Sequence, residues 1–233
     1  MNLLPLKFSN SQSARDFAEQ HTARVLRPIK SDRATLRLLD LPDQPIRRVI
    51  CKDFFDTPRW YRRSVGRFLI SHECGAYRRL QGVPGIPAIY GRPHPDMMLM
   101  QYIEGAGGQA AEDLWKYKPG ELPPEVLTQM QDLLTAIHDR RVIHLDIGHD
   151  CRRNFERETN FMWDPSQQKV YLIDFAGAFY GMPIPGFIRR GFEAHDNLAL
   201  VKIHDHFFPD MPYQAPEPLP NWAEKLFTKL KKI

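Results

Sequence analysis

Residues 136–146 read AIHDRRVIHLD, and residues 160–176 read NFMWDPSQQKVYLIDFA. The first stretch ends a helical pattern of apolar residues and delivers His144 and Asp146. The second stretch predicts two short strands joined by a turn, and its return strand ends at Asp174. Because a carboxylate at the end of an apolar strand points out of the sheet, we expect Asp174 to be available for chemistry, and Asp146 follows the helix in a His-x-Asp motif.

These side chains are of the type that phosphoryl transfer requires. One aspartate orients the attacking hydroxyl, and an aspartate with an asparagine supplies oxygen ligands to Mg²⁺. Asp146 suits the first role, and Asn160 with Asp174 suits the second. Asn154 is a competing metal ligand, and Asp150 with Asn154 is a competing register. We favour Asn160 because it opens the strand whose hairpin returns at Asp174.

The first half of the chain places two charges where the pattern is apolar. Lys52 lies in a predicted strand over 46–55, and Glu73 lies on the apolar stripe of a predicted helix over 58–81. That stripe consists of Val65, Leu69, Ala76 and Leu80. A buried lysine is costly unless an anion meets it, so each charge is the natural partner of the other. The alternatives are a solvated lysine on an edge strand, and two side chains that reach water independently.

The order of elements predicts two lobes. The glycine cluster over 105–108 separates a strand-rich part, residues 1–104, from a helix-rich part, residues 105–233. The elements that we expect are a helix over 13–21, a hairpin of 23–29 with 34–41, strands over 46–55 and 97–105, a helix with Leu127, Met130, Leu134 and Ile137 on one face, strands over 161–163 and 169–175, a helix containing 196–208, and a basic helix over 221–233.

Composition narrows the class of protein. The 233 residues carry a net charge of +4, which fits an anionic ligand but is too weak to indicate nucleic acid by itself. Three cysteines without a CxxC pair argue against a disulfide framework or a zinc ribbon. We find no signal peptide and no apolar run of about 20 residues, so we expect a cytoplasmic protein.

Two further patterns in the sequence allow other hypotheses, a metal-dependent hydrolase and a membrane contact. The runs His144-Leu-Asp146 and His204-Asp205-His206, with His138, His149, His195, Asp150 and Asp196 nearby in sequence, could hold Zn²⁺ or Mn²⁺ in a metal-dependent hydrolase, although the helical HExxH pair is missing. The basic helix over 221–233 is amphipathic, and it could contact an anionic membrane surface or simply dock on the second lobe.

Taken in order, these pieces resemble the protein-kinase-like superfamily. They are Lys52 after Val-Ile-Cys, Glu73 in the following helix, the strand 98–105, His144-Leu-Asp146, Asn160-Phe-Met-Trp and Asp174-Phe-Ala. Within the superfamily the chain is similar to small bacterial lipopolysaccharide-core (Kdo and heptose) kinases and to RIO-like atypical kinases, because little sequence follows Asp174 and no Ala-Pro-Glu segment is present.

The resemblance implies an α+β, bilobal protein-kinase-like fold with ATP between the lobes. It further implies a Mg²⁺-dependent phosphotransferase that acts on a hydroxyl of a sugar, a lipopolysaccharide core or a protein. Lys52, oriented by Glu73, would hold the α- and β-phosphates, and Asp146 would act on the acceptor. Asn160 and Asp174 would bind the metal. The adenine would meet the backbone of Gln101, Tyr102 and Ile103, with Met100 behind it.

The chain departs from the family pattern in three places. The missing glycines favour an alternative, a non-catalytic, pseudokinase-like binding module, whereas the presence of Lys52, Glu73, Asp146 and Asp174 argues against it. The first hairpin turn, residues 29–34, contains no glycine to close over phosphates. Leu145 stands where an arginine is usual, so control by phosphorylation through that arginine is not expected. The segment 147–159 is an apparent insertion, which could bind an acceptor or be a solvated loop.

Overall fold

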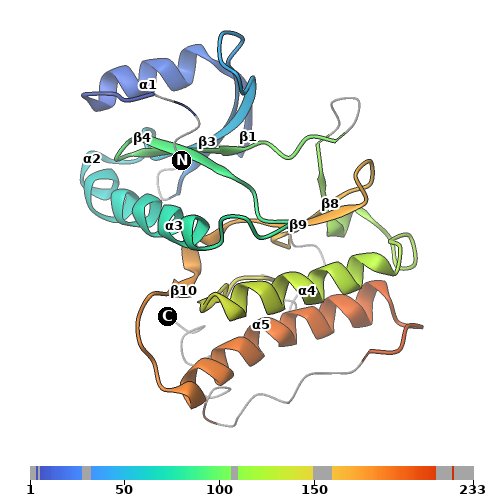
Figure 1. Ribbon diagram of the computed structural model, residues 1–233. Coiled ribbons are helices and arrows are strands. Elements are labelled where there is room, and N and C mark those ends of the chain that lie inside the picture. Colours follow the sequence, from blue (N-terminus) through green and yellow to red (C-terminus); the bar gives the residue numbers. More distant parts are fainter. Residues whose placement is uncertain are drawn as a thin grey trace. The chain divides into compact units, whose positions relative to one another are not determined.

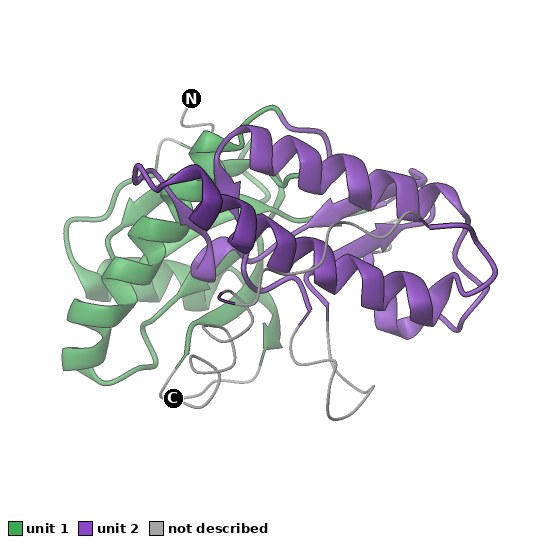
Figure 2. Ribbon diagram, turned by 90° about the horizontal axis from the view of Figure 1, so that it is seen from below, with its two compact units in different colours: residues 1–82, 86–104 green, residues 83–85, 105–233 purple. Residues whose placement is uncertain are grey.

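The computed structural model describes residues 4, 6–27, 33–105, 110–148, 159–213 and 222 (Figure 1). The chain divides into two compact units (Figure 2). Unit 1 comprises residues 1–82 and 86–104, and unit 2 comprises residues 83–85 and 105–233. The change between units after residue 104 lies where the glycine cluster begins. The nucleotide-binding and catalytic roles assigned to the two lobes remain predictions.

Unit 1 contains one antiparallel sheet of five strands in the order β1-β2-β3-β5-β4. The strands are β1 (Thr22–Arg27), β2 (Thr35–Asp40), β3 (Arg48–Asp53), β4 (Ile89–His94) and β5 (Met97–Gln101). Four of them lie where the alternation of side chains predicts. We did not predict β4, because glycine and proline dominate the sequence before and within it. The strand forms nonetheless at the sheet edge, where Pro93 and an irregular register at Gly91 are tolerated.

Helices cover both faces of this sheet (Figure 1). Helix α1 (Ser11–Gln20) begins at Asn10, whose side chain accepts a hydrogen bond from the N–H of Ser13. Its buried face packs against one side of the sheet in a cluster with Leu39, Val49, Cys51 and Leu99 among others. Helix α3 (Arg67–Arg79) contacts β4 and β5. Lys52 therefore belongs to the sheet face opposite to the α1 cluster, as the alternation along β3 predicts.

The helix predicted over 58–81 contains a π-helical segment. The helix α2 (Arg59–Tyr61) continues into the π-helix η1 (Arg62–Gly66) and then into α3. The predicted apolar stripe is wrong at its start, because Val65 is 37% exposed. Glu73 is buried, together with Ile70, Cys74, Ala76 and Tyr77. The π-helical turn takes extra residues, so it rotates the face that α3 presents relative to a continuous α-helix.

Unit 2 combines two long helices with short strands. Helices α4 (Glu125–Asp139) and α5 (Gly186–Phe207) lie side by side (Figure 1). Residues Leu127, Met130, Leu134 and Ile137 of α4 are buried, which confirms the predicted stripe. The strands β8 (Phe161–Asp164) and β9 (Lys169–Leu172) form the predicted hairpin, but β9 ends before residue 175, where the prediction ended it. The remaining elements are β6 (Glu112–Asp113), which pairs with β8, the 3-10 helices η3 (Leu114–Lys116) and η4 (Phe175–Gly177), and β7 (Val142–Ile143), which pairs with β10 (Phe179–Tyr180).

Several predictions lie outside the described residues. They are the turn over 29–32, the glycines at 107 and 108, the loop that contains Asp150 and Asn154, and the basic helix over 221–233 apart from Trp222. In the part of the chain that the structure describes, no helix is both long enough and apolar enough to cross a bilayer.

Candidate active-site residues in both units

Lys52 and Glu73 form a buried ion pair in unit 1. The Lys52 Nζ atom lies 2.7 Å from Glu73 Oε2, and the two side chains are 7% and 1% exposed. Strand β3 lies in the middle of the sheet, with Lys52 opposite Leu36 of β2 and Met98 of β5. The alternatives of an edge-strand lysine and of two independent side chains are therefore wrong. A buried pair of this kind holds the ammonium group in one place, where an anionic ligand can meet it.

Asp96, in the turn between β4 and β5, anchors the helix that carries Glu73. Its carboxylate is fully buried and accepts hydrogen bonds from Arg67 Nε at 2.6 Å and from Ser11 Oγ at 3.0 Å. Arg62 Nε lies 3.4 Å from the same carboxylate. The start of α3, the η1 segment and α1 thus share one buried anion. Sequence analysis missed Asp96, because its partners are brought together only by the fold.

The residues predicted to receive adenine are the last two of β5, Met100 and Gln101, and the next two in the chain, Tyr102 and Ile103. Met100 is buried, and the N–H of Gln101 donates to the carbonyl of Ala88 at 2.8 Å. The Gln101 side chain accepts from the N–H of Ala88 at 3.1 Å. Because the Gln101 N–H already donates to Ala88, the N–H groups of Tyr102 and Ile103 are better candidates to bind the adenine.

Asn160 joins the two segments of unit 2 that carry Asp146 and Asp174. Its side-chain amide donates to the backbone carbonyl of Asp146, and its N–H donates to Ile147 O at 3.1 Å. Its own carbonyl accepts from the N–H of Ile173 at 2.9 Å. Asn160 therefore lies beside the loop of Asp146 and beside the strand end that precedes Asp174. Asn154 lies outside the described residues, so the choice of Asn160 over Asn154 stays a prediction.

The conformation of Asp174 sets it apart from the strand before it. The residue has φ 61° and ψ 69°, in the left-handed region that a non-glycine residue seldom adopts. It stands between β9 and the 3-10 helix η4. Strained backbone of this kind costs of the order of 1–3 kcal/mol and concentrates at functional sites.

The donor set of Asn160 and Asp174 fits Mg²⁺. The amide nitrogen of Asn160 points to the carbonyl of Asp146, which leaves its Oδ1 oxygen free to face elsewhere. Carboxylate and amide oxygens are the hard ligands that Mg²⁺ prefers. Asn160 and Asp174 are thus the residues that would hold the cation.

His144 braces the same loop. Its Nε2 donates to the carbonyl of Ile173 at 2.9 Å, and its Nδ1 accepts from the N–H of Asp146 at 3.3 Å. The ring packs edge-on against Phe175, with 4.7 Å between the ring centroids. His144 is therefore committed to holding Asp146 near the end of β9.

Asp196 of α5 binds the backbone of the loop that carries His144 and Asp146. The sequence analysis named Asp196 only as a possible metal ligand. Its carboxylate accepts hydrogen bonds from the N–H groups of His144 and Leu145, each at 2.8 Å, and from His138 Nε2 at 3.0 Å. The side chain is fully buried. Helix α5 carries several other charged residues, so no pattern in the sequence singled out Asp196 as buried, and only the fold shows what it binds.

These contacts weaken the metal-hydrolase alternative. Three of its proposed ligands already have other partners. Asp196 is hydrogen-bonded to the side chain of His138 and to the N–H of His144, and the His144 ring is hydrogen-bonded to the carbonyl of Ile173. His204 Nε2 donates to the carbonyl of Met211 at 2.9 Å. Among the described residues, no three His, Cys, Asp or Glu side chains gather as a set of metal ligands.

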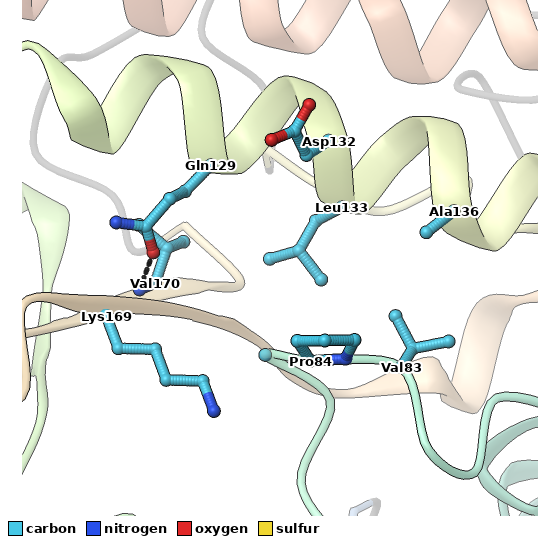
Figure 3. Close-up of a pocket in the computed structure, with 9 residues that line it drawn as sticks. Val83, Pro84, Gln129, Asp132, Leu133, Ala136, Lys169 and Val170 are labelled. Carbon is cyan, nitrogen blue, oxygen red and sulfur yellow. Dashed lines mark hydrogen bonds between the residues drawn. The ribbon is translucent and has the colours of Figure 1, made fainter.

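Unit 2 also contains a cavity of about 250 Å³ (Figure 3). Its lining comes from the segment Val83–Gly85, from α4 and from β9. Gln129 closes one side, where its side-chain oxygen accepts from the N–H of Val170 at 2.9 Å. The cavity is lined mainly by apolar groups and includes none of the predicted site residues.

The solved structures that resemble the chain include two kinases. The Rio2 kinase of Chaetomium thermophilum, solved as a complex with ADP, Mg²⁺ and phosphoaspartate, aligns with a TM-score of 0.61 and 12% identity over 91% of this chain. The fold is protein-kinase-like. The chain spans 64% of the length of the Rio2 chain. The PK-1 kinase of Cydia pomonella granulovirus aligns with a TM-score of 0.50 and 15% identity, over 90% of this chain and 81% of the viral one.

The predicted fold class is thereby confirmed, with a strand-rich unit that carries one main helix and a reduced helical unit. No protein-family model and no curated protein sequence matches the chain. The similarity to lipopolysaccharide-core kinases and the roles of the individual site residues remain predictions.

Proposed function

We propose that this protein is an ATP- and Mg²⁺-dependent phosphotransferase that acts on a hydroxyl group. Asp146 orients the acceptor hydroxyl and accepts its proton. The hydroxyl oxygen then forms a bond to the γ-phosphorus of ATP while the bond to the β-γ bridging oxygen breaks, and ADP leaves. Lys52, held by Glu73, meets the phosphates of the nucleotide. Bound Mg²⁺ would neutralise the charge on those phosphates.

The observation that carries this proposal is the hydrogen-bonded arrangement around Asn160. One residue connects the loop of Asp146 with the strand end of Asp174, and Asp196 fixes the same loop from α5. Positioning and charge stabilisation supply most of the rate in phosphoryl transfer, and such a braced site provides the first. The Rio2 complex with ADP and Mg²⁺ supports the choice of nucleotide and cation.

For the acceptor we propose a sugar hydroxyl, including one in a lipopolysaccharide core, ahead of a protein serine. This choice rests on the resemblance to small bacterial sugar kinases. A single aspartate suits any of these hydroxyls, so the acceptor has to be identified by assay. We expect the reaction in the cytoplasm, where ATP is available.

The experiment is phosphoryl transfer from labelled ATP to a panel of core oligosaccharides and proteins. We expect the wild-type chain to label one class of acceptor. Asp146→Asn and Asp174→Asn should each lower the rate by about 10²–10⁴. Asp210→Asn, at an exposed site, is the matched control and should keep the wild-type rate. Full activity of both Asp146→Asn and Asp174→Asn would contradict the proposal.

A thermal melt with and without Mg·ATP separates the proposal from the non-catalytic alternative. We expect Mg·ATP to raise the melting temperature of the wild type, because a ligand that binds the folded state stabilises it. Absence of both stabilisation and turnover would instead identify a binding module that keeps only the fold.

A further inference from the structure

The helical run from α2 through α3 exposes large aromatic side chains. Trp60 is 71% exposed and Phe68 is 65% exposed, and Val65 between them is 37% exposed. Figure 1 shows α2 and α3 following one another as one helical run in unit 1. The π-helical segment Arg62–Gly66 lies between Trp60 and Phe68, and a π-helical turn brings residues five apart to the same side. Trp60 and Val65 therefore share a side of the helical run, and Phe68 follows three residues after Val65 on that side. Exposed apolar side chains gathered in this way mark a binding surface more often than single ones do.

Arginines flank these aromatic residues, and the helical run that carries them contains no exposed acid over residues 57–72. Arg59 and Arg63 are exposed, and neither forms an ion pair with any residue that the structure describes. Between residues 57 and 72 the sequence contains no aspartate or glutamate, and Glu73 is buried against Lys52. Arg62 and Arg67 contact Asp96 instead. The surface is thus cationic as well as aromatic.

The polar group between the two aromatic residues is already satisfied. The hydroxyl of Ser64 donates to the carbonyl of Trp60 at 2.7 Å, within the helix. It therefore needs no water when the surface becomes covered. Phe68 stacks on the ring of His72, with 5.7 Å between centroids and 17° between planes, which extends the aromatic side along α3.

We propose that this aromatic–arginine face, formed by Arg59, Trp60, Arg63, Val65 and Phe68, binds the surface of an anionic lipid bilayer. Trp and Phe side chains enter the boundary between headgroups and acyl chains, and arginines meet the anionic headgroups. The face belongs to one helical run with exposed side chains, so it can lie on a planar surface without a matching groove. It is distinct from the basic segment over 221–233, and it requires no catalytic activity.

The positive charge of the aromatic–arginine face also argues against a second copy of the chain as its binding partner. A two-fold symmetric dimer through this face would place the same surface of each copy against the other. Arg59 and Arg63 would then lie near their own counterparts with no acid on the face to compensate them. A bilayer that carries phosphatidylserine supplies the opposite charge over the whole surface.

The test is flotation of the full-length protein with vesicles. We expect binding to phosphatidylcholine vesicles that contain about one third phosphatidylserine, and much weaker binding to pure phosphatidylcholine. Arg59→Gln with Arg63→Gln should weaken binding to the anionic vesicles by about thirty-fold and leave the weak binding to neutral ones unchanged. Trp60→Ala with Phe68→Ala should weaken binding to the anionic vesicles by at least tenfold.

The matched control is Arg24→Gln with Leu26→Ala, which removes an exposed arginine and an exposed apolar residue from β1. It should bind vesicles as the wild type does. Unchanged far-UV circular dichroism will show that all variants are folded, and Asp146→Asn should bind normally, which keeps this result independent of catalysis. Equal binding of the Trp60/Phe68 variant and the wild type would overturn the proposal. Absence of vesicle binding by the wild type would also overturn it. The same holds if the substitutions change only self-association, measured by sedimentation, or only binding to single-stranded RNA.

Discussion

Asp196 holds Leu145 in a left-handed conformation. The Asp196 Oδ1 atom accepts the N–H of Leu145 at 2.8 Å, while Leu145 has a φ of 63°. A leucine pays for this backbone conformation with steric strain, so a compensating contact is needed. The second oxygen of the same carboxylate accepts the N–H of His144. The loop that delivers Asp146 is therefore shaped by a buried charge on α5.

Replacing this charge should unfold the loop locally and weaken the whole unit. Asp196→Asn leaves a buried amide NH₂ facing backbone N–H donors, and we expect unfolding in urea to become easier by about 3 kcal/mol. Asp205→Asn, on the same helix with a side chain that is 68% exposed, should change stability by less than about 0.5 kcal/mol. Equal stability of the two variants would refute the assigned role of Asp196.

The Lys52–Glu73 pair should show strong coupling. Lys52→Met leaves the Glu73 carboxylate buried without its cation, and we expect a loss of about 3–5 kcal/mol. Adding Glu73→Leu removes the uncompensated charge, so the double variant should be more stable than Lys52→Met alone. Denaturant unfolding of the four proteins in the cycle measures this. Additive losses would show that the two side chains do not act as a pair.

Gly85 should tolerate no side chain. Its φ is 85°, and a Cβ atom there would lie 2.7 Å from the carbonyl oxygen of Val170. We expect Gly85→Ala to cost about 2–5 kcal/mol, from backbone strain and overpacking together. Gly120 has a similar φ of 80° with open space around it, so Gly120→Ala reports the strain alone. It should cost about 1–2 kcal/mol, and an equal loss at both sites would remove the argument from packing.

Stability should fall in mild acid because of His94. Burial is the main cause that lowers the pKa of this residue, and its Nδ1 accepts the N–H of Asp96 at 3.1 Å. With the folded pKa below the unfolded value of about 6.5, the unfolded state binds the proton more tightly. Stability is then full above about pH 6.5 and is lost as the pH falls through the lowered folded pKa.

Protonation of His94 can change the free energy of unfolding by at most about 1.4 kcal/mol per pH unit, because one proton is bound. Urea unfolding of the wild type and of His94→Asn between about pH 5 and pH 7 isolates it from other titrating groups. Asparagine keeps an acceptor near the N–H of Asp96 but does not titrate, so its curve should be flatter. Parallel curves would assign the acid sensitivity to other residues.

The charged residues show how far the sequence alone could go. The pairing of Lys52 with Glu73 follows from two charges on apolar faces, and the structure contains that pair. The choice of Asn160 over Asn154 followed from strand order, and it stays a prediction because Asn154 lies outside the described residues. The prediction that Val65 lies on the buried stripe was wrong, because periodicity assumes a uniform α-helix. The π-helical turn at Arg62–Gly66 cannot be recognised from a pattern of residue types.

What the sequence by itself determined is the order of elements and the identity of the charges that must be buried or used. Alternation and helical spacing are local properties, so they can be recognised in the chain without knowing its fold. What only the tertiary structure decided is which distant groups meet. Asp196 with Leu145, and Asp96 with Arg67, are far apart in sequence, and folding makes them partners because a buried carboxylate must find donors wherever the packing supplies them.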